Sequence, residues 1–366
     1  MRIAIIGSKG IPGHHGVEVV VENVATRLVA LGHEVSILGY NSYFKGLETY
    51  KGCDLIGFDG SERYSLEMPT HVLKEIKYLS NREDKYDLVH IHSVDPCMFT
   101  KSLRKLYPIV ATSHGRVYMR EEVGVIRKMA SRLAERNFMN TGQVITAVSP
   151  IDAKYYRRKY GREVNYIPNG LNTPSGISTE PLAKWSLEPD RYILFSAGRI
   201  IPSKGLHLVI EAYSKLNVDI PLVVVGGPGY DGSYYQQMRK TASDKVIFTG
   251  FISDDSLWSV YANTMVALFP SDYEAQSMTL LELISLNIPV IYSDIPENLA
   301  VADNIGIPFY NGDSDSLRDK MLFFFDNYAM EQSKTLTLSH SIRSVHNWDR
   351  IVNLYLKCYE RARSIH

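Results

Sequence analysis

The stretch MVALFPSDYEAQSMTLLELISLNIPVIY, residues 265–292, contains an apolar run, a polar loop, a helical segment and a second apolar run. The runs Met265–Pro270 and Ile288–Tyr292 have the length and residue types of buried strands. A strand, a helix and a strand in this order are typical of a parallel α/β sheet. Glu274 is expected in the loop after the first strand, and Glu282 two turns into the helix. Two carboxylates are thus predicted at the edge of the sheet where ligands bind.

Two explanations fit this pair of glutamates. Carboxylates are costly to place between apolar strands, so both side chains are candidates for a site. A loop acid followed by a helix acid suits the hydroxyls of a sugar and of a ribose. Alternatively, Glu274 is an acid in the first turn of a helix, where the helix dipole favours it, and Glu282 is a surface residue. The pair alone leaves both explanations open.

The same alternation of short apolar runs and amphipathic segments continues along the 366 residues. Near-continuous Val, Ile and Leu runs with helices between them indicate parallel sheets covered on both faces. Two such series, each with its own first strand, predict two doubly wound domains. The expected strands are 3–6, 35–38, 88–91, 109–112, 144–147 and 164–167, then 192–197, 222–225, 246–248, 265–269, 290–292 and 307–309.

We place the first domain at residues 1–171 plus 348–366 and the second at residues 172–347. The segment Asn172–Pro189 is rich in Pro, Ser, Thr and Gly and is the expected linker. The final segment, Trp348–His366, has a helical pattern and could cross back onto the first domain.

The distribution of charge is more informative than its total. Lys plus Arg and Asp plus Glu each number 40, so the net charge gives no sign of a nucleic-acid partner. Residues 101–162, however, contain fourteen Lys or Arg and four Asp or Glu. This excess suggests a face that meets an anion, although a set of solvated helix faces would also explain it. Four of these cations could line one flank of a helix: Arg127, Lys128, Arg132 and Arg136.

Cysteine usage and hydropathy favour a cytoplasmic protein. Cys53, Cys97 and Cys358 are scattered and form no CxxC pair, which fits free thiols in a reducing compartment. The chain starts with a strand-like run rather than a signal peptide, and it has no apolar run of about 18 residues. Contact with the cytoplasmic face of the membrane stays open.

The first expected strand is followed by the glycine-rich loop GSKGIPGHHG, residues 7–16, and then by a helix. Glycines let a backbone approach an anion, and a helix N-terminus offers unpaired N–H groups. The spacing is GxxGxxG rather than the GxGxxG of dinucleotide-binding folds, and no acid follows the second strand at residues 37–41. A ligand-facing glycine loop of another kind is therefore expected.

Three histidines lie near expected strand ends. His90 and His92 share one face of a strand, and two histidines this close could bind a metal, but no third ligand stands nearby in the sequence. A core histidine or a strand-end histidine that faces a cleft explains them more simply. His114 follows the strand 109–112 and could donate a hydrogen bond to a substrate hydroxyl or phosphate.

The second domain opens with a strand and the loop that contains Arg199 and Lys204. An Arg and a Lys in a strand-to-helix loop suit a diphosphate, because the guanidinium offers a planar fork, the ammonium a compact charge and the next helix its dipole. Two exposed cations are the alternative. Asp313 and Asp315 match a DxD metal pattern, but a helix N-cap is the simpler explanation. The glycine turns 225–229 and 248–251 could wall a nucleotide base or be turns alone.

Together these segments resemble the retaining glycosyltransferases of family 4, which have the GT-B architecture of two Rossmann-like domains facing across a cleft. The resemblance covers nearly the whole chain. It is most specific at Gly198-Arg199 through Lys204-Gly205 and at Glu274 with Glu282, because residue type, spacing and order all fit. It also rests on residues 16–18, 112–115 and 167–170. The stretch 6–16 is similar to a bacterial rhamnosyltransferase-like subgroup.

The resemblance implies roles for individual residues. Arg199 and Lys204 would bind the donor diphosphate, and Glu282 the ribose hydroxyls. Glu274 would contact the donor sugar, and His114 would touch this sugar near the reacting carbon. The implied catalytic residues are His114, Arg199, Lys204 and Glu274. Further donor contacts are implied at Gly16, Gly250, Phe251, Gln276, Ser277, Met278 and Thr279, and acceptor-side contacts at His15, His92 and Arg116.

Three departures from the family pattern stand out. Gln276 and Ser277 replace a frequent aromatic residue and glycine, which could mark a different donor. His15 and Gly16 stand where a double glycine is usual, so His15 could intrude on the phosphate site or contact the acceptor. Asn287 replaces a glycine at a helix end.

The resemblance implies attack on the same face as the leaving group, with the leaving phosphate taking the acceptor proton. Fixed cations that stabilise the departing diphosphate lower the barrier, and the loss of one such group typically costs ~10²–10³ in rate. Because Arg199 and Lys204 would neutralise the diphosphate, no metal or other cofactor is expected.

We therefore expect a hexosyl- or deoxyhexosyltransferase that uses a nucleoside-diphosphate sugar in surface polysaccharide or glycoconjugate biosynthesis. The acceptor would be a glycan or a lipid-linked glycan, and residues 101–162 would hold an anionic, lipid-linked acceptor at the membrane surface. A sugar-nucleotide epimerase of the same architecture and a non-catalytic sugar-nucleotide-binding subunit are the alternatives. An epimerase would turn over the donor without an acceptor, whereas a transferase would not do so quickly.

Overall fold

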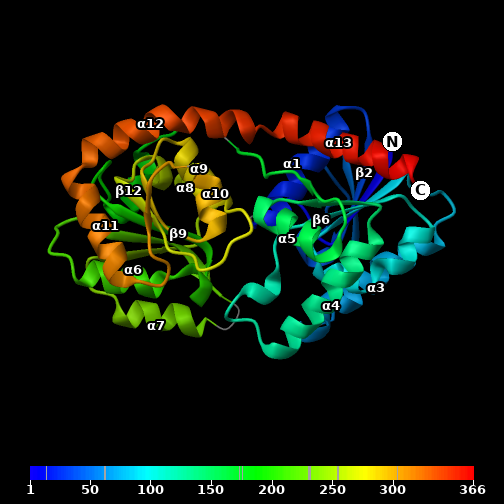
Figure 1. Ribbon diagram of the computed structural model, residues 1–366, viewed down its shortest axis with the longest axis horizontal. Helices are drawn as coiled ribbons and strands as arrows, with labels where there is room; N and C mark the ends of the chain where they lie inside the picture. The colour runs from blue at the N-terminus through cyan, green and yellow to red at the C-terminus, as the bar shows by residue number, and fades with distance from the viewer. Residues whose placement is uncertain are drawn as a thin grey trace. The chain divides into compact units, whose positions relative to one another are not determined.

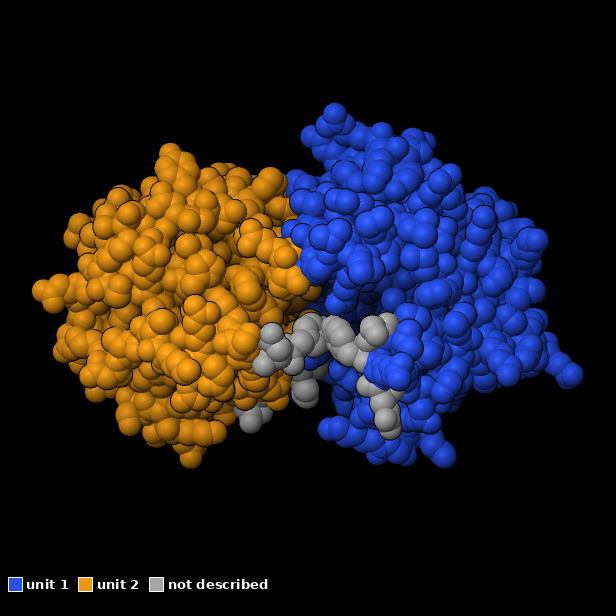
Figure 2. Space-filling view, turned by 90° about the horizontal axis from the view of Figure 1, so that it is seen from below, with its two compact units in different colours: residues 1–119, 123–170, 346–366 blue, residues 120–122, 171–345 orange. Residues whose placement is uncertain are grey.

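The computed structural model describes two compact units (Figures 1 and 2). Unit 1 comprises residues 1–119, 123–170 and 346–366, and unit 2 comprises residues 120–122 and 171–345. The described residues are 1–13, 15–61, 63–172, 174, 176–229, 232–253, 255–302 and 304–366, without the side chains of Tyr64 and Ser65.

Unit 1 is built on an eight-stranded sheet with the order β3-β4-β2-β1-β5-β6-β7-β8. All neighbouring strands are parallel except β3 and β4. The strands are β1 (Arg2–Ile6), β2 (Glu34–Tyr40), β3 (Thr49–Tyr50), β4 (Cys53–Phe58), β5 (Leu88–His92), β6 (Ile109–Ser113), β7 (Val144–Ala147) and β8 (Asn165–Tyr166).

Unit 2 is built on a six-stranded, fully parallel sheet with the order β11-β10-β9-β12-β13-β14. Its strands are β9 (Ile193–Ile200), β10 (Leu222–Pro228), β11 (Val246–Gly250), β12 (Val266–Phe269), β13 (Val290–Ser293) and β14 (Ile307–Phe309). Apolar side chains of these strands belong to two separate core clusters, which explains why the runs read as continuously apolar.

Helices follow most strands in both units (Figure 1). Unit 1 contains α1 (Gly16–Ala30), α2 (Asn41–Phe44), α3 (Tyr64–Asn81), α4 (Val125–Thr141), α5 (Pro150–Tyr160) and α13 (Trp348–Ser364). Unit 2 contains α6 (Leu206–Ser214), α7 (Ser233–Thr241), α8 (Asp255–Ala262), α9 (Met278–Ser285), α10 (Pro296–Ala302), α11 (Ser314–Asp326) and α12 (Tyr328–Val345). The 3-10 helices are η1 (Asp95–Met98), η2 (Thr100–Lys105), η3 (Val117–Met119), η4 (Glu180–Trp185) and η5 (Pro202–Lys204).

The prediction of two doubly wound α/β domains is confirmed. The C-terminal helix α13 belongs to unit 1, where it packs against α1, β5, β6 and β7. The cleft between the domains stays a prediction.

Two sequence interpretations were incomplete. Strand β4 was missed because Asp54 and Gly57 interrupt its apolar pattern, yet it pairs with β2 along its length. The expected linker is partly a folded element, because η4 forms within it and Leu182 and Leu187 are buried in the core of unit 2. Its residues Thr173 and Ser175 lie outside the described part of the chain.

Candidate active site

The loops after β9 and β12 meet where the strand order of unit 2 reverses. The two strands are neighbours in the sheet. The helices that follow them cover opposite faces, because α6 packs with Phe195 in one core cluster and α9 packs with Leu194 in the other. Ligands of doubly wound sheets bind at this point, beyond the carboxyl ends of the strands. Lys204 lies in the first loop and Glu274 in the second.

Lys204 and Glu274 form an ion pair between their Nζ and Oε1 atoms. The side chain of Glu274 is 11% exposed and that of Lys204 is 26% exposed. Ser271 Oγ donates a hydrogen bond of 2.9 Å to the same Glu274 oxygen. Lys204 and Glu274 were predicted as site residues from two separate segments of the sequence, and the structure places them in contact. Ser271 was missed, since its contact depends on loop closure rather than on spacing.

Gly205 permits the close approach of these two loops. Its φ is +71°, and an added Cβ would lie 2.3 Å from the carbonyl oxygen of Pro270. Both the backbone conformation and the lack of space therefore require glycine. The backbone N–H of Asp272 also donates to the carbonyl of Ser203 at 3.1 Å, so main-chain contacts hold the loops together.

Asp272 is a second acid beside this pair. Burial, and after it the carboxylates of Glu121 and Glu122, raise the pKa of Asp272 to about 6. Its Oδ1 atom is buried, and no residue in the described part of the chain forms a hydrogen bond with it. The carboxyl groups of Asp272 and Glu274, both in the loop after β12, therefore lie near the ammonium group of Lys204.

The N-terminus of α9 follows directly after Glu274. Ser277 is its N-cap, and its Oγ accepts a hydrogen bond of 3.2 Å from the N–H of Leu280. Gln276 and Ser277 are buried, while Met278 and Thr279 are half-buried in the first turn. These four predicted donor-binding residues therefore lie together at a positive helix end.

Glu282 lies on the fifth residue of α9, just over one turn from its start. The prediction of two turns was wrong, because the loop continues to Ser277 before the helix begins. The side chain is half-buried, and burial raises its pKa to about 8. Its carboxyl has no hydrogen-bond or ion-pair partner among the residues that the structure describes. A partly buried carboxyl group without a partner is costly, so the surface explanation does not fit Glu282.

Arg199 lies inside β9 rather than in the following loop, which corrects the sequence interpretation. It pairs in register with Gly227 of β10, after a shift in the ladder between Val225 and Gly227. Gly250 ends β11 with φ +76°. Phe251, the next residue, is 46% exposed, and a Cβ on Gly227 would lie 3.5 Å from its Cβ. The glycine turns of β10 and β11 are therefore neighbours, with an exposed aromatic ring beside them.

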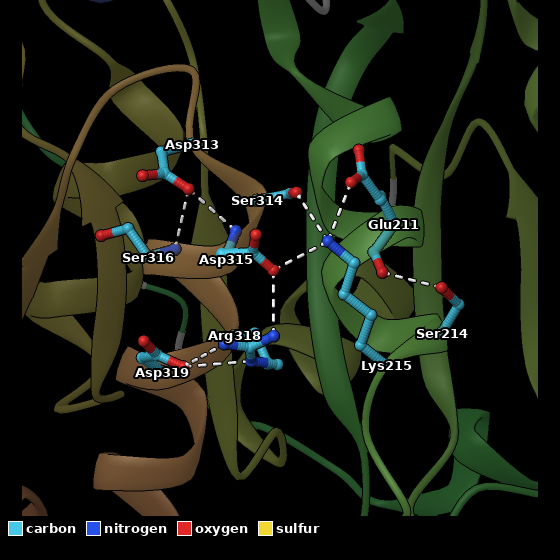
Figure 3. Close-up of polar contacts among 9 residues, drawn as sticks. All are labelled: Glu211, Ser214, Lys215, Asp313, Ser314, Asp315, Ser316, Arg318 and Asp319. Atoms are coloured by element: carbon cyan, nitrogen blue, oxygen red, sulfur yellow. Dashed lines mark hydrogen bonds and ion pairs between the residues drawn. The ribbon is translucent and has the colours of Figure 1, made fainter.

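Asp313 caps a helix and Asp315 forms ion pairs, so both carboxylates have structural partners (Figure 3). Asp313 Oδ1 caps α11 by accepting from the N–H groups of Asp315 at 2.9 Å and Ser316 at 3.0 Å, so the N-cap interpretation is confirmed. Asp315 Oδ1 forms ion pairs with Lys215 Nζ at 2.8 Å and Arg318 Nη1 at 2.9 Å. The described residues contain no group of three side chains that could hold a metal ion.

In unit 1 the strand order reverses between β1 and β5. Gly7 follows β1, and a Cβ on it would lie 2.2 Å from the carbonyl oxygen of His92 at the end of β5. His15 is the N-cap residue of α1 and Gly16 its first residue. Apart from the chain neighbours of Gly16 and the backbone of α1 itself, no atom of the described residues lies within 4 Å of a Cβ placed on Gly16. His14, in the same loop, lies outside the described residues.

The strand-end histidines form a buried row in unit 1. His90 is a satisfied core histidine, with ring nitrogens 2.8 Å from Tyr359 Oη and 2.7 Å from Thr112 Oγ1. His92 Nδ1 lies 2.8 Å from His114 Nε2, whereas His92 Nε2 is buried and has no hydrogen-bond partner among the described residues. Burial lowers the pKa of His114 to about 4 and that of His92 well below its usual value. Both rings are therefore neutral at pH 7.

Arg116 is held inside unit 1. Its Nε lies 2.6 Å from Asp152 Oδ1, and its guanidinium stacks over the ring of Tyr155 at 4.4 Å. The side chain is 10% exposed. It thus connects the loop after β6 to α5, and its predicted contact with the acceptor stays a prediction.

Two doubly wound units, each with a glycine loop at its switch point and with charged side chains at that of unit 2, have the GT-B fold of glycosyltransferases. The chain is a glycosyltransferase. The Glycosyltransferase Family 4 model matches residues 14–174, and the model of glycosyl transferases group 1 matches residues 179–336.

Relatives and solved structures agree with this assignment. Alpha-monoglucosyldiacylglycerol synthase of Acholeplasma laidlawii is 25% identical over 85% of both chains. Phosphatidyl-myo-inositol mannosyltransferase of Mycobacterium leprae is 24% identical over 75% of this chain and 73% of its own. Sucrose-phosphate synthase from Thermosynechococcus elongatus has a TM-score of 0.84 at 19% identity, covering 100% of both chains. HepE of Anabaena, in complex with UDP, has a TM-score of 0.77 at 16% identity, covering 98% of this chain and 99% of its own.

The first prediction concerns the pH dependence of stability. The folded state keeps the proton of Glu282 up to a pH of about 8, whereas the unfolded chain releases it near the usual value of 4.5. The contribution of Glu282 to stability therefore falls as pH rises between these values. Glu282→Gln cannot ionise, so we expect its Tm to exceed that of the parent by a few degrees at pH 8–9 and to match it near pH 5.

Thermal unfolding of the ligand-free protein between pH 5 and pH 9 measures this difference. Glu180→Gln replaces an exposed acid of unit 2 and is the matched control, with an unchanged profile expected. A Glu282→Gln profile parallel to the parent at all pH values would show that Glu282 is not held in a protonated state.

Proposed function

We propose that this glycosyltransferase moves a sugar, with retention of configuration, from a nucleoside-diphosphate sugar to a glycan or lipid-linked acceptor in surface polysaccharide or glycoconjugate biosynthesis. The observation that supports it best is the contact of Lys204 with Glu274, which gives one switch point a cation for a diphosphate and an acid for sugar hydroxyls. HepE, a structural neighbour, is solved with UDP-glucose, and several relatives are named for lipid substrates.

In this proposal each part of the switch point in unit 2 binds one part of the donor. Lys204, Arg199 and the N-terminus of α9 stabilise the diphosphate as it leaves. Glu274 orients the sugar, and Glu282 binds the ribose hydroxyls. The ribose hydroxyls would provide the carboxyl of Glu282 with the partners that the described residues do not. Phe251 and Gly250 border the base.

The chemistry needs a leaving group that accepts a proton. The acceptor hydroxyl attacks the anomeric carbon on the face from which the diphosphate departs, and the departing phosphate oxygen takes the hydroxyl proton. Two fixed cations neutralise the diphosphate, so we propose that no metal ion takes part. His114, neutral and fixed by His92, can donate a hydrogen bond to the sugar but cannot supply a positive charge at pH 7.

The location follows from the acceptor. We propose that the enzyme works in the cytoplasm, at the inner face of the membrane where a lipid-linked acceptor is accessible. Within the described residues no helix is long and apolar enough to cross a bilayer. Glycosyltransferase models match both halves of the chain, so neither a sugar-nucleotide epimerase nor a non-catalytic subunit is favoured.

The identity of the donor sugar depends on the residues between the two glutamates. Ser277 uses its hydroxyl to cap α9, so its departure from the family glycine has a structural reason. Gln276 is buried beside Glu274 and is the better candidate for reading the sugar. Assignment to a rhamnosyltransferase-like subgroup stays a prediction.

The central prediction is loss of activity without loss of fold. Lys204→Ala and Glu282→Ala should each lower transfer at least ~10²-fold, because each removes a contact to the leaving nucleotide. A thermal-shift screen against UDP, GDP, dTDP and ADP sugars identifies the donor, since binding stabilises the folded state by RT ln(1 + [L]/Kd). Parent-like turnover by both variants with that donor would refute the site.

Another prediction separates diphosphate binding from sugar transfer. Glu274→Gln removes the carboxylate that neutralises Lys204, so the free nucleoside diphosphate should bind several-fold more tightly. Transfer should fall, because the sugar loses an acceptor of its hydroxyl protons. Isothermal titration with the nucleotide and a transfer assay give the two values. Weaker nucleotide binding by Glu274→Gln would contradict the role of Lys204.

The last prediction on the donor site concerns Gly16. An alanine has room in the protein at this position, so Gly16→Ala should keep the parent Tm. If the donor phosphates approach Gly16, the methyl group should weaken donor binding at least tenfold. Gly124→Ala is the matched control, because it also sits at a helix start of unit 1 with open space around it. Unchanged donor binding in Gly16→Ala would exclude this contact.

A further inference from the structure

The outward side of α4 is apolar. Val125, Ile126, Met129 and Leu133 keep 74%, 86%, 64% and 54% of their surfaces exposed. Their spacing of one, four and eight positions from Val125 places them on one side of the helix. A helix that packs on a core normally turns polar side chains to solvent, so an exposed apolar row indicates an interaction surface.

The inward side of α4 packs against the core of unit 1. Ala134, Phe138 and Met139 are buried in its core. Glu135, an acid of the helix, also points inward and is fully buried. The exposed apolar row is therefore additional to the side that holds the helix in the fold.

Glu135 fixes α4 in this orientation. Its carboxylate accepts hydrogen bonds from Tyr118 at 2.6 Å and from Tyr160 at 2.7 Å, and it forms an ion pair of 2.7 Å with Lys159. Tyr118 lies in η3, four residues after His114. The network holds α4 against the segment that follows β6, so a partner bound to α4 would be fixed relative to the candidate acceptor side.

Positive charge surrounds the apolar row. Arg132 and Arg136 are exposed, three positions after Met129 and Leu133 respectively, so they border the same side of the helix. At the C-terminal end of α4, an open hollow of about 860 Å³ is lined by Lys101, Ser102, Arg104, Lys105 and Asn140. Arg104 donates to the carbonyl of Asn140, which connects this basic hollow to the helix.

We propose that α4 docks on an anionic membrane surface. Ile126, Met129 and Leu133 enter the boundary between head groups and acyl chains, while Arg132 and Arg136 bind lipid phosphates. An apolar row with cations on its border matches the chemistry of an anionic bilayer surface. Its purpose rests on the proposed function, because a lipid-linked acceptor would be presented there. A second copy of this chain is the competing occupant, and the flanking cations of two identical rows would repel each other.

The test is co-sedimentation of the full chain with vesicles of phosphatidylglycerol and phosphatidylcholine, compared with phosphatidylcholine alone. We expect binding to the anionic vesicles, weaker at high salt. Met129→Ser/Leu133→Ser should lower the partition coefficient about tenfold or more, because two apolar side chains no longer leave water. Arg132→Gln/Arg136→Gln should weaken binding and reduce its dependence on salt.

Met330→Ser/Leu336→Ser is the matched control. It makes the same substitutions on α12 of unit 2, where both side chains are 54% exposed, and it should bind vesicles like the parent. The proposal is overturned if the parent does not bind anionic vesicles, or if the α4 and α12 variants bind equally. It is also overturned if light scattering shows a dimer that the α4 variant alone abolishes.

Co-sedimentation with vesicles is measured without sugar donor or acceptor. Failure of the enzyme to transfer sugar would therefore leave the docking result intact, and failure to dock would leave the donor site untouched. A thermal shift of the α4 variant with the identified donor, equal to that of the parent, confirms that unit 2 is unaffected.

Discussion

The close contact between the loops after β9 and β12 is the constraint on which the candidate site depends. The helices after these strands leave on opposite faces of the sheet, so the loops would diverge without a tie. Gly205 lets one loop touch the carbonyl of Pro270, and the Asp272 N–H joins the other to Ser203. The ion pair of Lys204 and Glu274 lies on this frame. A side chain larger than hydrogen at Gly205 would separate the loops and with them the two charges.

Lys204 and Glu282 contribute to the candidate site in different ways. Lys204 is neutralised by Glu274, so a diphosphate must compete with a carboxylate that is already in place. Glu282, in contrast, has a raised pKa because burial disfavours its charged form. Such a group lowers the stability of the free protein and gains partners when hydroxyl groups bind. The stability cost and the binding function of Glu282 therefore have the same physical origin.

Much of the fold was predictable because buried parallel strands read as short apolar runs, and all twelve expected runs correspond to strands. Strand β4 escaped because a polar residue and a glycine break its run. Within the site, residue type and spacing identified Lys204, Glu274 and Glu282. Their distances, the role of Ser271 and the pKa of Glu282 depend on loop closure and burial, which a linear pattern does not contain. The helix start at Met278 was misplaced for the same reason, since the cap is defined by a hydrogen bond from Leu280.

The basic stretch 101–162 shows that the number of cations in a segment does not give the positive charge that it exposes on the surface. Several of its cations serve the fold: Arg116 pairs with Asp152, Arg157 donates to the carbonyl of Val164 and Arg162 to that of Gly142. These side chains add to the number of cations in the segment, but they bind groups within the protein rather than an external anion. The outward side of α4 is instead centred on apolar residues, with Arg132 and Arg136 at its border. Helical spacing alone cannot show which side of α4 is exposed, because that depends on which of its residues pack into the core. Because Glu135 and Phe138 turn inward, the apolar row on the other side of α4 faces solvent. Arg132 and Arg136 suit a membrane surface because they lie next to this row.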